Sequence, residues 1–140
     1  MSLLVSFYML LASAAGASPT VTVEAAEGDW SSLPSLQVRG NDHLDTRRMA
    51  RLHAIAKSGE CSLPGYSKGQ LVMRLSFAAQ FDPAGSLQRI VLPKLDCPEA
   101  EGIIGGALLK MVSGGDYKPT GKSAEGWYRG QFNFTMDGRS

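Results

Sequence analysis

The side chains of this chain that could do chemistry are two histidines, several acids and many serines. His43 and His53 fall on different faces of one predicted helix, and neither has a cysteine or an acid at the spacing of a metal site. No serine stands in a nucleophile elbow. These residues predict no metal centre, no catalytic nucleophile and no cofactor, so we expect the protein not to be an enzyme.

Two pairs of acids have the spacing of a catalytic dyad but also a simpler explanation. Asp42 with Asp45, and Glu99 with Glu101, each lie in the first turn of a predicted helix. Acids are favoured there because the helix dipole presents its positive end. We interpret both pairs as residues that begin helices.

Gly121-Lys122-Ser123 has the letters that end a phosphate-binding loop. Such a loop needs a glycine five positions before Gly121 and a helix after the serine. Asp116 stands in the place of that glycine and would repel phosphate, Pro119 removes a backbone amide, and a strand is expected to follow. We interpret the segment as a polar surface loop.

The balance of charge gives no sign of a polyanionic partner. Lysine and arginine number 14 and acids number 13, for a formal net charge of +1, and 44% of the residues are hydrophobic. These values fit one globular domain with a single core, and they do not indicate nucleic-acid binding.

The N-terminal stretch indicates export. Residues 3–12 are mostly apolar and are followed by small residues up to Ala17, a pattern that a signal peptidase accepts before Ser18. We predict that residues 1–17 are a signal peptide cleaved after Ala17. One feature departs from a signal peptide: no lysine or arginine precedes Arg39, so the basic start typical of such peptides is missing. The alternative is that the same residues are retained as a membrane anchor.

The two cysteines, Cys61 and Cys97, take their meaning from that export. In an oxidising compartment an even pair favours a disulfide, whereas in the cytosol the same residues would be buried thiols. We predict a bond between Cys61 and Cys97.

Three strands are predicted from alternating apolar residues. Gln70 to Phe81 alternates as a strand buried on one face does, and Asp82-Pro83-Ala84-Gly85 predicts a reversal into a second strand over residues 87–92. The alternation from Trp127 to Met136 predicts the third. The sequence leaves open whether this last strand pairs with the first or with the second.

Two helices are predicted around this hairpin, each with an apolar stripe that faces a core. The first is capped by Asn41 or Asp42 and ends at Gly59, and the second begins at Pro98. Three glycines of the second helix have no role in this pattern beyond a close contact with a neighbouring segment: Gly102, Gly105 and Gly106.

These elements define one domain behind an irregular start. We expect residues 18–40 to be an irregular lead-in, because prolines and glycines interrupt them. Over residues 41–140 we expect an α+β domain in which a small three-stranded antiparallel sheet packs with two helices.

The second half of the chain resembles the C-terminal domain of TonB-family energy transducers. That family shows a glycine before its first strand, a D-x-x-G hairpin turn, an aromatic-x-Pro segment after a helix, and an aromatic-x-aromatic pattern in its last strand. The matching residues here are Gly69, Asp82, Gly85, Tyr117, Pro119, Phe132 and Phe134.

The resemblance implies a periplasmic, stand-alone domain whose last strand offers an edge to an extended peptide of an outer-membrane receptor or another envelope protein, or to a second copy in a homodimer. The alternatives are a small exported enzyme or inhibitor with a site around Trp127, and a structural envelope protein. By the resemblance, partner-binding residues are expected at Trp127, Arg129, Gln131, Phe132, Asn133, Phe134 and Thr135.

Overall fold

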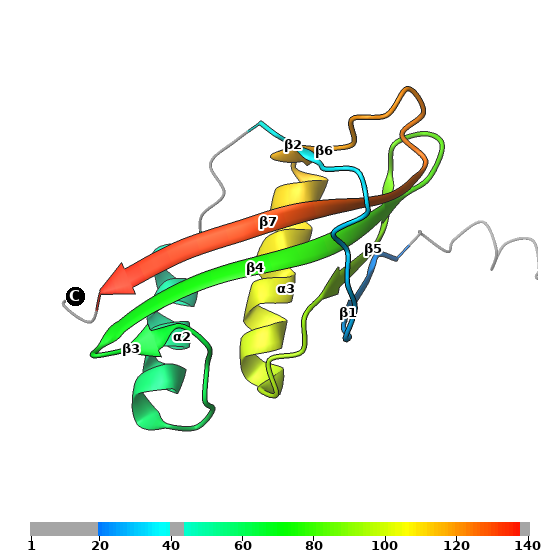
Figure 1. The fold of residues 1–140 in the computed structure, drawn as a ribbon. Helices are drawn as coiled ribbons and strands as arrows, with labels where there is room; N and C mark the ends of the chain where they lie inside the picture. Colours follow the sequence, from blue (N-terminus) through cyan, green and yellow to red (C-terminus); the bar gives the residue numbers. More distant parts are fainter. Residues whose placement is uncertain (1–19, 40–43, 138–140) are drawn as a thin grey trace, which may run out of the picture.

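A computed structural model describes residues 20–39 and 44–137. In this part of the chain two helices stand against a five-stranded mixed sheet, with a two-stranded sheet beside it (Figure 1). The expected signal peptide lies outside the described residues. The elements in chain order are β1 (Thr22–Ala25), β2 (Gln37–Val38), α2 (Thr46–Ser58), β3 (Tyr66–Ser67), β4 (Gln70–Phe81), β5 (Leu87–Leu92), α3 (Pro98–Ser113), β6 (Tyr117–Lys118) and β7 (Gly126–Asp137).

The long strand β4 is the centre of the main sheet. β7 runs antiparallel along all of it, from Gln70 opposite Asp137 to Phe81 opposite Gly126. On the other side of β4, β5 and the short β3 pair with its two ends, and β1 adds to β5 in parallel. The α+β class is therefore confirmed, but the sheet is mixed and larger than the expected three antiparallel strands. The last strand pairs with the first strand of the hairpin.

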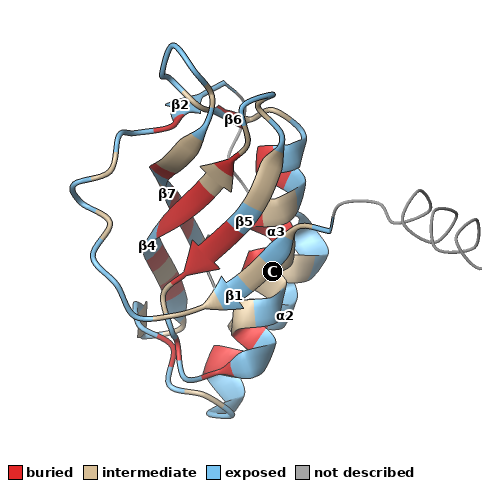
Figure 2. Ribbon diagram, turned by 90° about the vertical axis from the view of Figure 1, so that its right-hand side faces the viewer, coloured by how far each residue is buried: buried red, intermediate tan, exposed pale blue. Residues whose placement is uncertain are grey.

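The two helices cover one face of the sheet, and the segment between β1 and β2 crosses the other (Figure 2). β4 and β7 turn every second side chain toward the helices, as their alternation predicts. The core between sheet and helices includes Leu71, Met73, Leu75, Phe77 and Phe81 of β4, Tyr128, Phe132 and Phe134 of β7, Leu52 and Ile55 of α2, and Ile104 and Leu108 of α3.

The hairpin between β4 and β5 turns at the predicted residues. The Asp82 carboxylate accepts hydrogen bonds from the backbone N–H groups of Ala84, at 3.0 Å, and Ser86, at 2.8 Å. Gly85 has a φ of 85°, a left-handed conformation that glycine adopts without strain. This turn sets the register in which β5 returns along β4.

The start of α2 differs from the prediction. Asp45 is the N-cap, and its side chain accepts a hydrogen bond from the backbone N–H of Arg48 at 2.8 Å. Asn41 and Asp42, expected as the cap, lie outside the described residues. The end of α2 is as predicted, with Gly59 left-handed at a φ of 78°.

The expected irregular lead-in contains two strands. β1 lies at the edge of the main sheet beside β5, and β2 pairs with β6. Gly105 of α3 explains how β1 fits, since a Cβ at Gly105 would stand only 2.8 Å from Cγ1 of Val23. The close neighbour expected for the helix glycines is therefore present at Gly105, whereas a Cβ at Gly102 would meet open space.

The predicted disulfide joins the end of α2 to the start of α3. The Cys61 and Cys97 sulfurs lie 2.10 Å apart, and Cys97 is buried. Beside the bond, Arg51 of α2 donates two hydrogen bonds to the Glu99 carboxylate, at 2.6 and 2.8 Å. The two helices are thus held together at one end by a covalent bond and a bidentate ion pair.

Candidate peptide-docking edge

β7 lies at one edge of the main sheet, because only one of its sides faces β4. Along the strand, one residue directs both its N–H and its C=O toward β4, and the next residue directs both away from it. Arg129 is one of the residues whose backbone groups point away from β4. Its N–H donates to the carbonyl of Pro34 and its C=O accepts from the N–H of Leu36, both at 2.8 Å.

The same outward direction holds for the residues at two-residue steps beyond Arg129, which are Gln131, Asn133 and Thr135. The Gln131 carbonyl accepts a hydrogen bond from the Tyr117 hydroxyl at 3.1 Å. In the described part of the chain, the outward backbone groups of Asn133 and Thr135 have no partner. The outer edge of β7 is therefore closed at Arg129 and open at Asn133 and Thr135.

The side chains of this edge lie on the open face of the sheet, opposite the helices. Gln131, Asn133 and Thr135 are all exposed, and with Arg74 of β4 they line a shallow hollow of about 410 Å³. Arg74 has no ion-pair partner among the described residues. A strand added beside β7 would place alternate side chains next to this polar surface.

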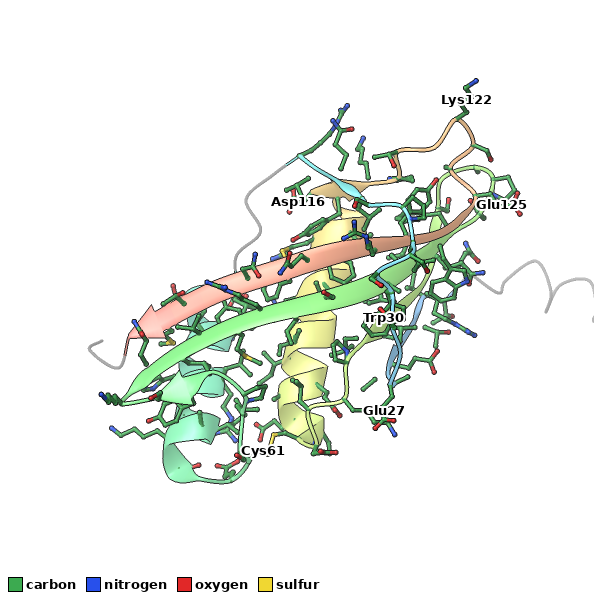
Figure 3. All side chains as sticks on the ribbon, in the orientation of Figure 1. Glu27, Trp30, Cys61, Asp116, Lys122 and Glu125 are labelled. Carbon is green, nitrogen blue, oxygen red and sulfur yellow. A yellow bond between two sulfur atoms is a disulfide. The ribbon has the colours of Figure 1, made fainter. Side chains whose placement is uncertain are left out.

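A second hollow, of about 490 Å³, continues from the first along the open face and shares Arg74 with it. Trp30, from the segment that crosses the sheet, forms one wall, and Figure 3 shows it against the face formed by β4 and β5. The face is thus divided: the crossing segment covers the half near β5, and the half near Asn133 and Thr135 is left exposed.

The structure separates the residues predicted to bind a partner into two groups. Phe132 and Phe134 are buried in the core, with their rings 5.4 Å apart, so their side chains hold β7 on the helices and do not reach the surface. Arg129, Gln131, Asn133 and Thr135 are exposed, and Trp127 is partly buried.

Two contributions to the edge were missed in the sequence. One is the segment Pro34–Leu36, which pairs with Arg129 in parallel, and the other is the hydroxyl of Tyr117. Tyr117 was singled out only as part of the aromatic-x-Pro pattern. Neither role has a local signal, because each depends on how distant segments meet.

The other candidates for chemistry stay apart from one another. The His53 ring donates from Nε2 to the Gly69 carbonyl at 2.8 Å, whereas His43 lies outside the described residues. Lys122 stands at the tip of the exposed loop before β7 (Figure 3). No group of three potential metal ligands occurs in residues 20–39 and 44–137.

Asp29, Asp45, Arg51 and Glu99 are exposed groups whose pKa values depart from the ordinary ones. A hydrogen bond from the Ser31 N–H lowers the pKa of Asp29, and one from the Arg48 N–H lowers that of Asp45. The hydrogen bonds between Arg51 and Glu99 lower the pKa of Glu99 and raise that of Arg51. Each of these four shifts is explained by a structural contact outside β7.

In comparisons with protein-family models, with curated proteins and with solved structures, nothing matches this chain. Of the helices in the described ranges, none is both long and apolar enough to cross a membrane.

Proposed function

We propose that this chain is an exported protein-binding module, and that an extended peptide of an envelope protein adds to the outer edge of β7 as a further strand. The observation that carries the proposal is the open stretch at Asn133 and Thr135, where backbone donors and acceptors face outward without a partner among the described residues. Strand addition takes its affinity from such groups and its specificity from alternate side chains.

The intramolecular contact at Arg129 supports this use of the edge. There the chain's own segment Pro34–Leu36 already adds to β7 through two main-chain hydrogen bonds of 2.8 Å. The edge is therefore straight and accessible enough at Arg129 for an extended segment to pair with it. Outward groups of the same kind recur further along the strand, at Asn133 and Thr135, for a segment from another molecule.

The class of partner comes from two further arguments. The Cys61–Cys97 disulfide is consistent with an oxidising compartment, where such bonds persist. The resemblance of the hairpin, helix and last strand to TonB-family C-terminal domains points to the periplasm and to an outer-membrane receptor as the partner.

The experiment uses proline to remove one outward donor. In Asn133→Pro the lost N–H faces away from β4, a position at which an edge strand tolerates proline. Asn133→Ala is the matched control, because it removes the same side chain and keeps the N–H. Peptides selected from a displayed library of random nine-residue sequences should bind the native protein and Asn133→Ala, and in both proteins the backbone amides at positions 133 and 135 should change chemical shift.

Binding to Asn133→Pro should fall at least about fivefold, the loss expected for one main-chain hydrogen bond of about 1 kcal/mol. Equal binding to both variants, or a selection that yields no peptide, contradicts strand addition. If a second copy is the partner, the native protein should dimerise at high concentration in sedimentation experiments, and Asn133→Pro should stay monomeric.

A further inference from the structure

We propose that the segment Pro34–Leu36 is a built-in stop, which fixes the register of the partner strand and limits the site to a short peptide paired with Asn133 and Thr135. This inference rests on the proposed function, because it concerns how the same edge is used. It adds a positioning role for a part of the chain that does not itself contact the open stretch.

At Arg129 the segment already pairs with the edge of β7 as a strand would. Pro34 and Leu36 use both outward backbone groups of Arg129, so a peptide cannot pair there while they remain. Beyond Leu36 the chain leaves β7, since Gln37–Val38 pairs with β6 instead. The segment therefore ends where the open stretch begins.

The segment is held by more than these two bonds. The Leu36 side chain is 7% exposed and belongs to the core. The Ser35 carbonyl accepts from the Thr120 hydroxyl at 3.0 Å, and the Leu33 carbonyl accepts from Nε of Arg129 at 2.9 Å. A peptide that displaced the segment would have to replace every one of these contacts and expose Leu36 to water. The segment is accordingly a fixed boundary and not a competitor that yields to the peptide.

Tyr117 extends the boundary from Arg129 to Gln131, the next residue whose backbone groups point outward. Tyr117 lies in β6, the short strand that pairs with Gln37–Val38 directly after Leu36. Its hydroxyl donates a hydrogen bond to the Gln131 carbonyl, so that carbonyl is not available to a peptide. Free pairing therefore begins beyond the Gln131 carbonyl, at Asn133, and continues to the end of β7 at Asp137. These five residues span about 16 Å, which fits a partner strand of about the same number of residues.

The first test needs no variant. The native protein is saturated with a nine-residue peptide selected as above, and amide signals are followed by NMR. The Asn133 and Thr135 amides should shift, while the Leu36 amide should keep its position because its bond to Arg129 persists. A large shift at Leu36 would show that the peptide displaces the segment and would overturn the stop. No shift at Asn133 or Thr135 would instead refute strand addition itself.

The second test compares peptide lengths. Trimming the nine-residue peptide to the five residues that pair should leave the affinity of the native protein within about twofold, because the removed residues have no edge to pair with. Leu36→Pro removes both the N–H that donates to the Arg129 carbonyl and the buried leucine side chain, which together anchor the segment. In this variant the segment should leave the edge, and the nine-residue peptide should bind at least about fivefold more tightly than the five-residue one.

Ser35→Ala is the control, because it keeps both backbone bonds to Arg129, and it should show no such gain. Circular dichroism establishes that each variant is folded. A nine-residue peptide that already binds the native protein more than about fivefold better than the short one contradicts the stop, as does a gain in the Ser35→Ala control equal to that in Leu36→Pro.

Discussion

Gly130 of β7 gives the sharpest test of the pairing that makes β7 an edge strand. It lies directly opposite Phe77 of β4, and its missing side chain would point toward the helices. A Cβ at this position would stand 2.4 Å from Cζ of Phe77 and 2.6 Å from Cε1, where ordinary contacts begin at 3.4 Å. Gly130→Ala therefore requires the Phe77 ring to move by about 1 Å in a close-packed core.

The ring has little room to move. Phe77 is 0% exposed, and its ring meets that of Tyr117 edge to face, with centroids 5.3 Å apart. Overpacking of this kind costs about 1–3 kcal/mol. Alanine in place of glycine returns about 0.4–1 kcal/mol by restricting the unfolded chain. The free energy of unfolding should fall by about 1–2 kcal/mol in Gly130→Ala.

Urea unfolding measures this change, with Gly102→Ala as the control. A Cβ at Gly102 of α3 would have no atom within 4 Å, so that substitution should stabilise the protein by about 0.5–1 kcal/mol. In a Phe77→Leu background, which removes the colliding ring atoms, Gly130→Ala should become nearly neutral. An equal loss in both backgrounds, or a gain in stability from Gly130→Ala alone, would refute the reasoning.

Two further predictions concern the junction of α2 and α3. Replacing Cys61 and Cys97 together by alanine removes a cross-link between residues 36 apart, and the free energy of unfolding should fall by about 4 kcal/mol; an unchanged urea midpoint contradicts the bond. The pKa of Glu99 is held below its ordinary 4.5 by the hydrogen bond from Arg51, so its carboxylate stabilises the fold above that pH and loses this effect as the pH falls through the lowered pKa. The advantage of the native protein over Glu99→Gln should therefore be present at neutral pH, shrink in salt and vanish once the pH lies well below the lowered pKa; an advantage that persists there contradicts the assignment.

The long elements of this fold were predictable because their signals are local and repeated. β4 and β7 each alternate over a long run, and the two helices carry apolar stripes with a glycine or a proline at the expected end. Cys61 and Cys97 were pairable because they are the only cysteines. In each case many residues, or a unique pair, agree on one answer.

The short elements were not predictable, because their stability comes from distant partners. β1 has only four residues, and it exists because β5 offers a parallel edge and Gly105 of α3 makes room for Val23. The cap of α2 was misplaced for a similar reason. Several acids and amides precede the helix, and the sequence alone does not select Asp45, the residue that caps it.

The candidate site divides along the same line. The alternation of β7 predicted that one face holds Arg129, Gln131, Asn133 and Thr135. It did not predict that Arg129 is already paired, since Pro34 lies far away in the sequence and no periodic pattern links the two residues.

The β1 and β7 edges of the main sheet are protected in different ways, and the difference supports the proposed docking function. Exposed edges invite unwanted pairing, so proteins usually shorten them, charge them or cover them. The β1 edge is only four residues long, and its Glu24 pairs with Arg89 of β5 at 3.6 Å. The β7 edge is covered by Pro34–Leu36 at Arg129, and beyond Arg129 it has no proline and no charged residue until Asp137, the last residue of the strand. An edge that the chain's own backbone covers at Arg129, and that is left uncovered and uncharged at Asn133 and Thr135, has the features of an edge that is kept open for a partner.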